Sequence, residues 1–138
     1  MWIRLLIAFA YISQAYAELV PVNDLGLKIA QGFEITHYAD SVIAPDVYSM
    51  TLDPSGSVVI SSRGYIKRLT DEDGDGVADT ESILIKSSAG AMGMLFLDER
   101  TLLTTEGGYF NRYIDKNGDG KFDSNPFRIG KFGGGEHG

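Results

Sequence analysis

A repeat of 44 residues constrains the fold of this chain more than any other feature of its sequence. The segment 58–79 aligns without a gap with the segment 102–123, and eight of the aligned positions are identical, among them Gly64 with Gly108 and Asp71 with Asp115. A unit of about 40–50 residues built from four short strands is typical of a β-propeller blade. A parallel β-helix repeats at about half that length, and a helical array needs a 3.6-residue pattern that is absent here.

Alternating apolar and polar residues between turn signals predict the strands of this repeat. The turn Asp53-Pro54-Ser55-Gly56 separates two of them, with proline and glycine at positions that favour a tight turn. The predicted strands are 33–38, 48–52, 58–61, 64–69 and 82–85. We therefore expect an all-β fold, with an N-terminal segment 18–47 that contains the first strand, followed by a partial propeller over 48–138.

The repeat predicts two blades, 48–85 and 92–129, and the start of a third over 130–138. Propellers close with 4–8 blades, which leaves no long sheet edge open. Two blades alone would expose unpaired edges and half of the apolar surface that lies between blades. The sequence therefore indicates the N-terminal fragment of a longer propeller.

Composition excludes several classes of site. The 138 residues include 19 acidic and 12 basic side chains, giving a formal charge of −7, which argues against a nucleic-acid partner. The chain has no cysteine, so it contains no disulfide, no zinc–thiolate site and no covalently attached haem. Any metal bound here needs oxygen or imidazole ligands.

The first 17 residues have the three parts of a secretory signal peptide. Arg4 supplies a positive start, an apolar run follows over 5–12, and Ala15-Tyr16-Ala17 places small residues before the cleavage point. The alternative is an uncleaved anchor, but the run is well short of the ~20 residues that span a bilayer. We expect a periplasmic or extracellular protein with no transmembrane span after cleavage.

Two acidic loops at equivalent positions of the repeat predict calcium sites. Both fit the pattern D-x-[DN]-x-D-G-x-x-D, in which side-chain oxygens at positions 1, 3, 5 and 9 and a backbone carbonyl at position 7 converge on one ion. The expected ligands are Asp71, Asp73, Asp75, Val77 and Asp79 in the first loop, and Asp115, Asn117, Asp119, Lys121 and Asp123 in the second.

Other interpretations of these loops are weaker. An EF-hand needs an acid at position 12, where this chain has Ser82 and Pro126, and it needs flanking helices. Mg²⁺ prefers fewer protein ligands and a rigid octahedron. A solvated Asp/Gly turn without metal is the remaining alternative. If the ion binds, its role is structural, because it fixes the loop in a chain that has no disulfide.

These residues resemble the N-terminal part of a bacterial family of exported propeller proteins related to sorbosone and soluble glucose dehydrogenases, many of which carry a CxxCH haem domain further along. The resemblance covers about 24–138. It rests on Gly26-Leu27-Lys28, on Gly32-Phe33-Glu34-Ile35, on Arg68-Leu69-Thr70 before the first loop, and on Gly134-Gly135-Glu136-His137-Gly138.

The resemblance implies a six-bladed propeller, in part of the family with pyrroloquinoline quinone on its axis, that oxidises a sugar or an alcohol and passes electrons to haem. It implies that His137 stands where these enzymes place the base that takes the hydroxyl proton. The blades that would supply cationic contacts to the quinone are not in this sequence, so the chain alone is expected to be inactive. The rival hypothesis is a non-catalytic propeller that binds carbohydrate or protein partners and uses calcium only as a brace.

Overall fold

The structure, a computed structural model, describes residues 18–86 and 88–132, and within them every regular element is a strand except one short 3₁₀ turn. The all-β class is therefore confirmed. No helix in this part of the chain has the length and apolar character needed to cross a bilayer. The predicted signal peptide 1–17 and the residues 133–138 of the predicted third blade lie outside the described residues.

The chain divides between Ile35 and Thr36 into two compact units. In the first unit, β1 (Leu19–Val22) and β2 (Leu27–Ala30) form an antiparallel hairpin across the 3₁₀ turn η1 (Asn23–Leu25). Gly26, with a φ of 64°, follows that turn in the left-handed region, where glycine carries no steric penalty. The sequence pattern did not predict this hairpin.

The predicted strand 33–38 is wrong, because residues 33–40 form no regular element. Alternation makes a strand only where another strand is available to pair with it. Residues 36–38 are instead hydrogen-bonded to the segment 76–78. The hydroxyl of Thr36 donates to the carbonyl of Gly76 at 2.8 Å, and the carbonyl of Tyr38 accepts from the N–H of Ala78 at 2.8 Å.

The second unit contains two four-stranded antiparallel sheets in which neighbouring strands are consecutive in the chain. The first sheet consists of β3 (Ser49–Leu52), β4 (Val58–Ser62), β5 (Tyr65–Thr70) and β6 (Thr80–Lys86). The second consists of β7 (Gly93–Asp98), β8 (Thr101–Glu106), β9 (Tyr109–Ile114) and β10 (Phe127–Lys131). Since β10 extends to Lys131, residues 130 and 131, expected in a third blade, belong to this second sheet.

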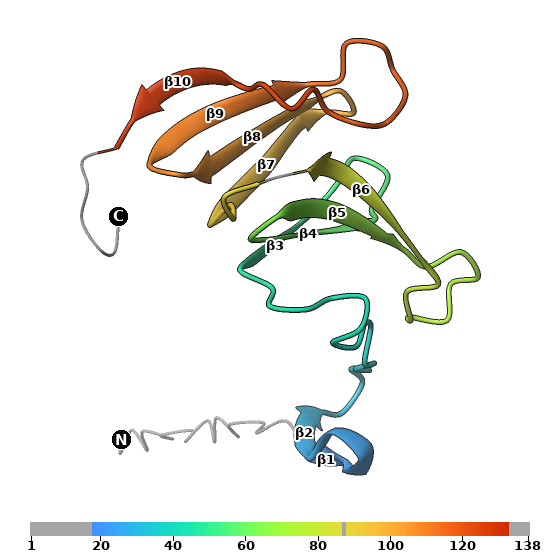
Figure 1. The fold of residues 1–138 in the computed structure, drawn as a ribbon. Coiled ribbons are helices and arrows are strands. Elements are labelled where there is room, and N and C mark those ends of the chain that lie inside the picture. The colour runs from blue at the N-terminus through green and yellow to red at the C-terminus, as the bar shows by residue number, and fades with distance from the viewer. Residues whose placement is uncertain (1–17, 87, 133–138) are drawn as a thin grey trace, which may run out of the picture. The chain divides into compact units, whose positions relative to one another are not determined.

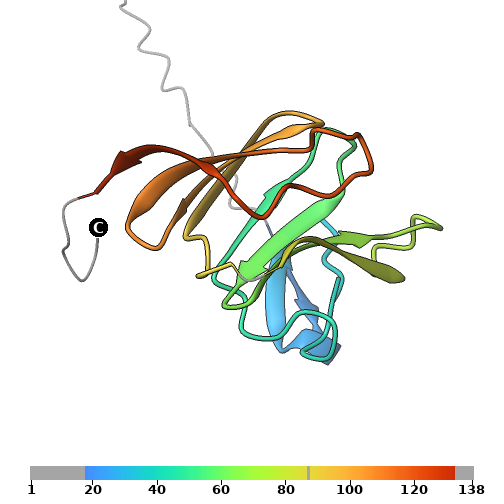
Figure 2. The same cartoon turned by 45° about the horizontal axis from the view of Figure 1, so that its top comes forward.

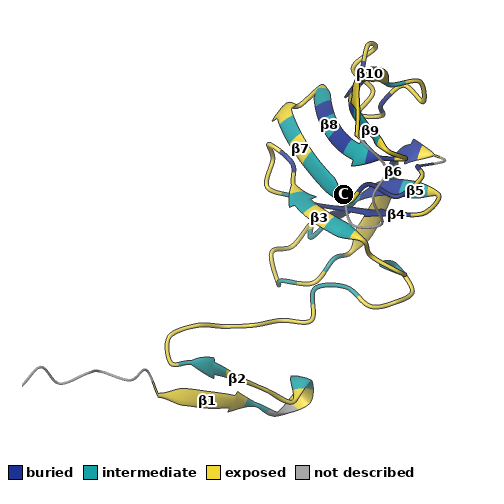
Figure 3. Ribbon diagram, turned by 90° about the vertical axis from the view of Figure 1, so that its left-hand side faces the viewer, coloured by how far each residue is buried: buried dark blue, intermediate teal, exposed yellow. Residues whose placement is uncertain are grey.

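The two sheets lie side by side, and their first strands, β3 and β7, are in contact (Figures 1 and 2). The core lies between them and appears as dark blue segments in Figure 3. Its buried side chains come from both sheets and their connections: Val59, Ile66, Leu84, Ile85, Ala91, Leu102, Tyr113 and Phe122. Each sheet therefore buries one of its two faces against the other sheet.

The opposite face of the second sheet carries several exposed apolar side chains and the exposed Arg112. Leu95 lies in register with Leu103 and, across the sheet, with Arg112 and Phe127, on the side away from the buried Leu102. We call the exposed members of this surface the open apolar face; they are Leu95, Leu97, Phe127 and Ile129, each between 46% and 61% exposed.

Candidate metal centre

The two acidic loops occupy the same place in the two sheets. Residues 71–79 connect β5 to β6, and residues 115–123 lie in the connection from β9 to β10, so each loop joins the third strand of its sheet to the fourth. The last residue of each loop also makes an equivalent backbone bond, from Asp79 N–H to the Thr70 carbonyl and from Asp123 N–H to the Ile114 carbonyl. The 44-residue repeat is thus also a structural repeat.

The first aspartate of each loop holds the turn by accepting two backbone N–H groups. Asp71 Oδ1 accepts from Gly74 at 2.7 Å, and its Oδ2 accepts from Gly76 at 2.9 Å. Asp115 repeats this arrangement with Gly118 at 2.6 Å and Gly120 at 3.0 Å. These four glycines have φ between 76° and 84°, so the tight turn requires a residue without a Cβ.

In the first loop three carboxylates converge. One oxygen from each of Asp71, Asp73 and Asp79 lies within 4.8 Å of the others. Asp79 also accepts from the N–H of Glu72 at 2.7 Å, which holds it over the start of the loop. Asp75 lies outside this group, and its Oδ1 accepts instead from the N–H of Val77 at 2.8 Å. Three hard oxygens at this spacing fit the donor set that Ca²⁺ prefers.

In the second loop the corresponding side chains bond to one another and to lysine. Asp119 accepts from the N–H of Lys121 at 2.9 Å and from the side-chain amide of Asn117 at 3.0 Å. Asp123 pairs with the ammonium group of Lys116 at 3.0 Å. Among the residues that the structure describes, the carboxylates of this loop form no converging group of three like that of the first.

The two loops also differ in charge. The first contains five acidic residues and no basic one, whereas the second contains three acidic residues and two lysines. Like charges crowded within a few ångströms repel unless a cation or a hydrogen-bond donor compensates them. The first loop therefore carries the more concentrated negative charge.

Two residues outside the loop pattern interact with the loops, Tyr38 with the first and Arg100 with the second. Burial, followed by the charges of Asp71 and Asp79, raises the pKa of Tyr38. At the second loop, Arg100 donates from Nε to the backbone carbonyl of Asp115 at 2.9 Å. Burial alone would raise the pKa of Asp115, but the N–H groups of Gly120 and Gly118 and the charge of Arg100 outweigh it and lower that pKa. Neither Tyr38 nor Arg100 lies within the loop motif, so the motif carries no signal for them.

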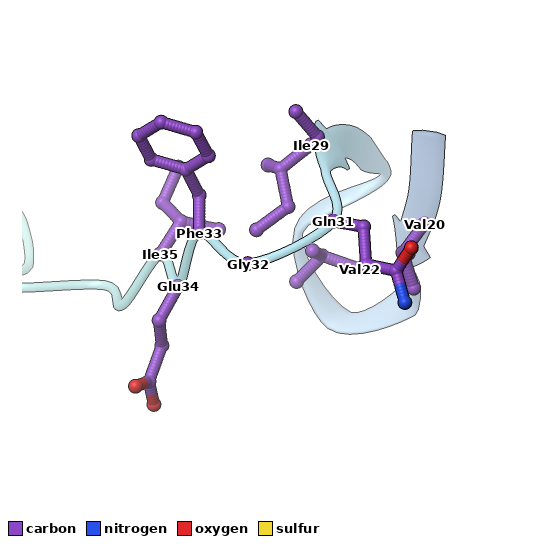
Figure 4. Close-up of a pocket in the computed structure, with 9 residues that line it drawn as sticks. Val20, Val22, Ile29, Gln31, Gly32, Phe33, Glu34 and Ile35 are labelled. Carbon is purple, nitrogen blue, oxygen red and sulfur yellow. The ribbon is translucent and has the colours of Figure 1, made fainter. Parts of the chain in front are cut away.

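His137, the residue that the family resemblance places at a catalytic position, lies outside the described residues. A separate pocket of about 390 Å³ lies in the first unit against the β1–β2 hairpin (Figure 4). Its walls are mainly apolar, with Val22, Ile29 and Phe33 among them, and Glu34 points away from these side chains. This pocket offers no constellation of polar groups for chemistry.

Comparison with known proteins bears on the fold. No protein-family model matches the chain, and no curated protein matches it. A solved structure that does match is the iodide structure of a Trichoderma reesei enzyme of carbohydrate-active enzyme family AA12, with a TM-score of 0.51 and 19% sequence identity. The match covers 61% of this chain and 23% of that one, so the chain spans less than a quarter of its neighbour's length. At this identity the likeness concerns the fold alone.

Proposed function

We propose that this chain is the calcium-stabilised N-terminal part of an exported β-propeller oxidoreductase of the quinone-dependent sugar or alcohol dehydrogenase type, and that the chain alone is inactive. The observation that carries the proposal is the convergence of Asp71, Asp73 and Asp79 in a loop whose hydrogen-bonded frame recurs one repeat later. Such a loop fits Ca²⁺ held as a structural ion.

The propeller part of the proposal is supported by the arrangement of the two sheets. Each is a four-stranded antiparallel meander of blade length, and the two first strands, β3 and β7, are neighbours, as the inner strands of adjacent blades are. The open apolar face is what a further blade would cover in a closed ring. A solved enzyme of family AA12 shares its fold with 61% of this chain.

The oxidoreductase part is supported by the family resemblance in the sequence. In that class the quinone accepts the hydride, and a neutral histidine accepts the hydroxyl proton; His137 is the residue of this chain proposed for that role. The described residues contribute the frame of the blades and the calcium loop to such an enzyme.

Calcium binding is tested by thermal unfolding of the whole chain with and without the ion. A ligand present at about 100 times its Kd stabilises the folded state by about 2.7 kcal/mol, which raises the melting temperature by about 10 °C in a domain of this size. We expect Ca²⁺ to raise the melting temperature and a chelator to reverse the rise, with a smaller effect of Mg²⁺. An identical melting curve under all conditions would rule out a structural role for the ion.

Substitution of single ligands localises the ion. Asp73→Asn removes one charge from the converging group, and we expect it to weaken calcium binding at least about tenfold in calorimetric titration, because a hydrogen bond or contact to a charged group contributes about 1.5–3 kcal/mol. Glu99→Gln, at an exposed turn in the second sheet, makes the same change of charge and is the control. Equal affinity of Asp73→Asn and the wild type would contradict the proposed site.

A further inference from the structure

The first sheet is covered on its inner face by the second sheet, but its other face is covered only in part. We call this other face the outer face of the first sheet; it carries Met50 and Leu52 of β3, Ile60 of β4 and Leu69 of β5. Ile60 and Leu69 are 4% and 1% exposed, whereas Met50 and Leu52 are 67% and 57% exposed. The part of the outer face that lies on β3 is therefore open.

Residues 36–38 occupy the place of an outer strand that precedes the first sheet. At the second acidic loop, the N–H of Phe122 donates at 3.0 Å to the carbonyl of Leu84 in β6, the fourth strand of the preceding sheet. At the equivalent position of the first loop, the N–H of Ala78 donates at 2.8 Å to the carbonyl of Tyr38. Tyr38 therefore lies where a fourth strand of a preceding sheet would lie, so the first sheet has the contacts of a blade that follows another blade.

The open positions of the outer face are those that are packed in the second sheet. The pairing registers of β3 and β7 make Met50 and Leu52 equivalent to Met94 and Phe96. Met94 and Phe96 pack against the core between the sheets, to which the first sheet contributes Val59, and β3 is in contact with β7. Within the part of the chain that the structure describes, Met50 and Leu52 lack the neighbouring sheet that their equivalents have.

The surface that fits these positions recurs on the second sheet, on the side of the open apolar face. The 44-residue repeat makes Leu103 the equivalent of Val59, and Leu103 lies in register with Leu95 of the open apolar face. Arg112 on this side does not prevent docking, because its equivalent, Arg68, lies on the inner face of the first sheet with 28% of its side chain exposed. The surface against which the second sheet packs is thus present a second time, without its partner.

We propose that the open apolar face of one copy of the chain docks on the outer face of the first sheet of a second copy, so that the contact between the two sheets is repeated between chains. This inference rests on the propeller part of the proposed function. A head-to-tail contact closes into a ring where its rotation allows, and about two to four copies of a two-sheet chain supply the 4–8 blades of a propeller. The β10 strand of the docking copy competes with residues 36–38 for the outer edge, which makes this contact weaker than the one within the chain.

Cross-linking of the whole chain tests which faces meet, since the chain has no cysteine of its own. Met50→Cys chains and ¹⁵N-labelled Leu95→Cys chains are mixed at micromolar concentration and treated with a short bismaleimide. We expect mass spectrometry to show covalent dimers of one labelled and one unlabelled chain, and no dimer from Leu95→Cys alone. Lys86→Cys, exposed on the outer strand β6, replaces Met50→Cys as the control and should give no product. Efficient cross-linking of Leu95→Cys with itself, or no cross-link in the mixture, would overturn the proposal.

A charge substitution tests the same contact without a cross-linker. We expect Met50→Lys to weaken association at least tenfold in sedimentation velocity and to leave the melting temperature unchanged, because Met50 is 67% exposed. Met92→Lys is the matched control, since Met92 is 68% exposed and belongs to neither docking surface. Undiminished association of Met50→Lys would overturn the proposal, whereas the effect of Ca²⁺ on the melting temperature would still stand, so its failure is distinguishable from that of the proposed calcium site.

Discussion

Asp53 shows how one buried side chain fixes the first turn of a sheet. It is 5% exposed and accepts hydrogen bonds from the N–H and hydroxyl of Ser55, from the N–H of Ser57 and from Arg68 Nε at 2.6 Å. Burial alone would raise the pKa of Asp53, but the bonds from Ser55 and Ser57 and the Arg68 guanidinium outweigh it and hold that pKa below its ordinary value. The ionised form is therefore the one that stabilises the fold.

Acid should remove this contribution. Since the folded pKa is depressed, the stabilisation is complete above the unfolded value of 3.8 and is lost as the pH falls through that value toward the folded one. We expect Asp53→Asn to lower the free energy of unfolding by about 2 kcal/mol at pH 6, with a smaller difference from wild type at pH 3, in urea titrations.

Asp98 provides the control for this prediction. It occupies the equivalent turn of the second sheet and accepts from the N–H of Arg100 at 2.8 Å, but it is exposed. We expect Asp98→Asn to change stability at pH 6 by less than Asp53→Asn, because the Asp98 side chain is exposed. A constant effect of Asp53→Asn from pH 6 to pH 3 would contradict the assigned role of its charge.

At the residue scale the sequence predicted where the acidic loops lie, but it did not predict how their side chains are arranged. The D-x-[DN]-x-D-G pattern specifies the turn only in part: Asp71 and Gly76 stand at fixed positions of the motif, whereas Gly74, which Asp71 also bonds, stands at a position that the motif leaves open. It does not specify which carboxylates converge. Asp75 bonds within the loop, and Thr36, 40 positions away, donates to the carbonyl of Gly76. Such contacts depend on the packed fold, which no local pattern contains.

At the scale of elements, strands with clear turn signals were predictable and isolated ones were not. The strands over 48–86 were found within a few residues, because alternation and the turn at 53–56 agree. The segment 33–38 alternates equally well but has no partner strand. The β1–β2 hairpin was missed because Pro21 lies inside a strand of four residues, where proline argues against a strand.

The connection between the two sheets depends on one glycine. Gly90 has a φ of 95°, and a Cβ at this position would lie 2.5 Å from the ring of Tyr48. Left-handed backbone costs other residues about 1–2 kcal/mol, and overpacking adds about 1–3 kcal/mol. We expect Gly90→Ala to lower the free energy of unfolding by several kcal/mol in chemical denaturation.

Gly56→Ala separates the two causes. Gly56 has nearly the same φ, 90°, but no atom lies within 4 Å of the position of its Cβ. We expect this variant to lose only the backbone part, about 1–2 kcal/mol. If the two variants are equally stable, Tyr48 does not pack against the connection.

At the scale of the whole molecule, the dominant feature is the open apolar face. The inner faces of the two sheets cover each other, but Leu95, Leu97, Phe127 and Ile129 have no covering element among the residues that the structure describes. Exposed apolar side chains gathered on one face of a sheet are typical of an interaction site or of a tendency to associate.

We expect the chain to self-associate through the open apolar face at micromolar concentrations. The double variant Leu95→Lys with Leu97→Lys should shift the population to monomer in sedimentation velocity without lowering the melting temperature, because both side chains are more than half exposed. Val42→Lys, at a residue that is 80% exposed elsewhere, is the control and should leave the association unchanged. A monomeric wild type would refute this expectation.

The pairing of Lys116 with Asp123 has a consequence for how the duplicated loops respond to their surroundings. The second loop has Lys116 at the position where the first loop has Glu72. Its Asp123 is therefore neutralised by a side chain of the same loop and not by an ion from the solvent. If the proposed calcium site is correct, dilution into a calcium-poor medium would destabilise the loop 71–79 between β5 and β6 and leave the loop 115–123 unchanged. The two copies of one repeat would then differ in that the first depends on calcium for its stability and the second does not.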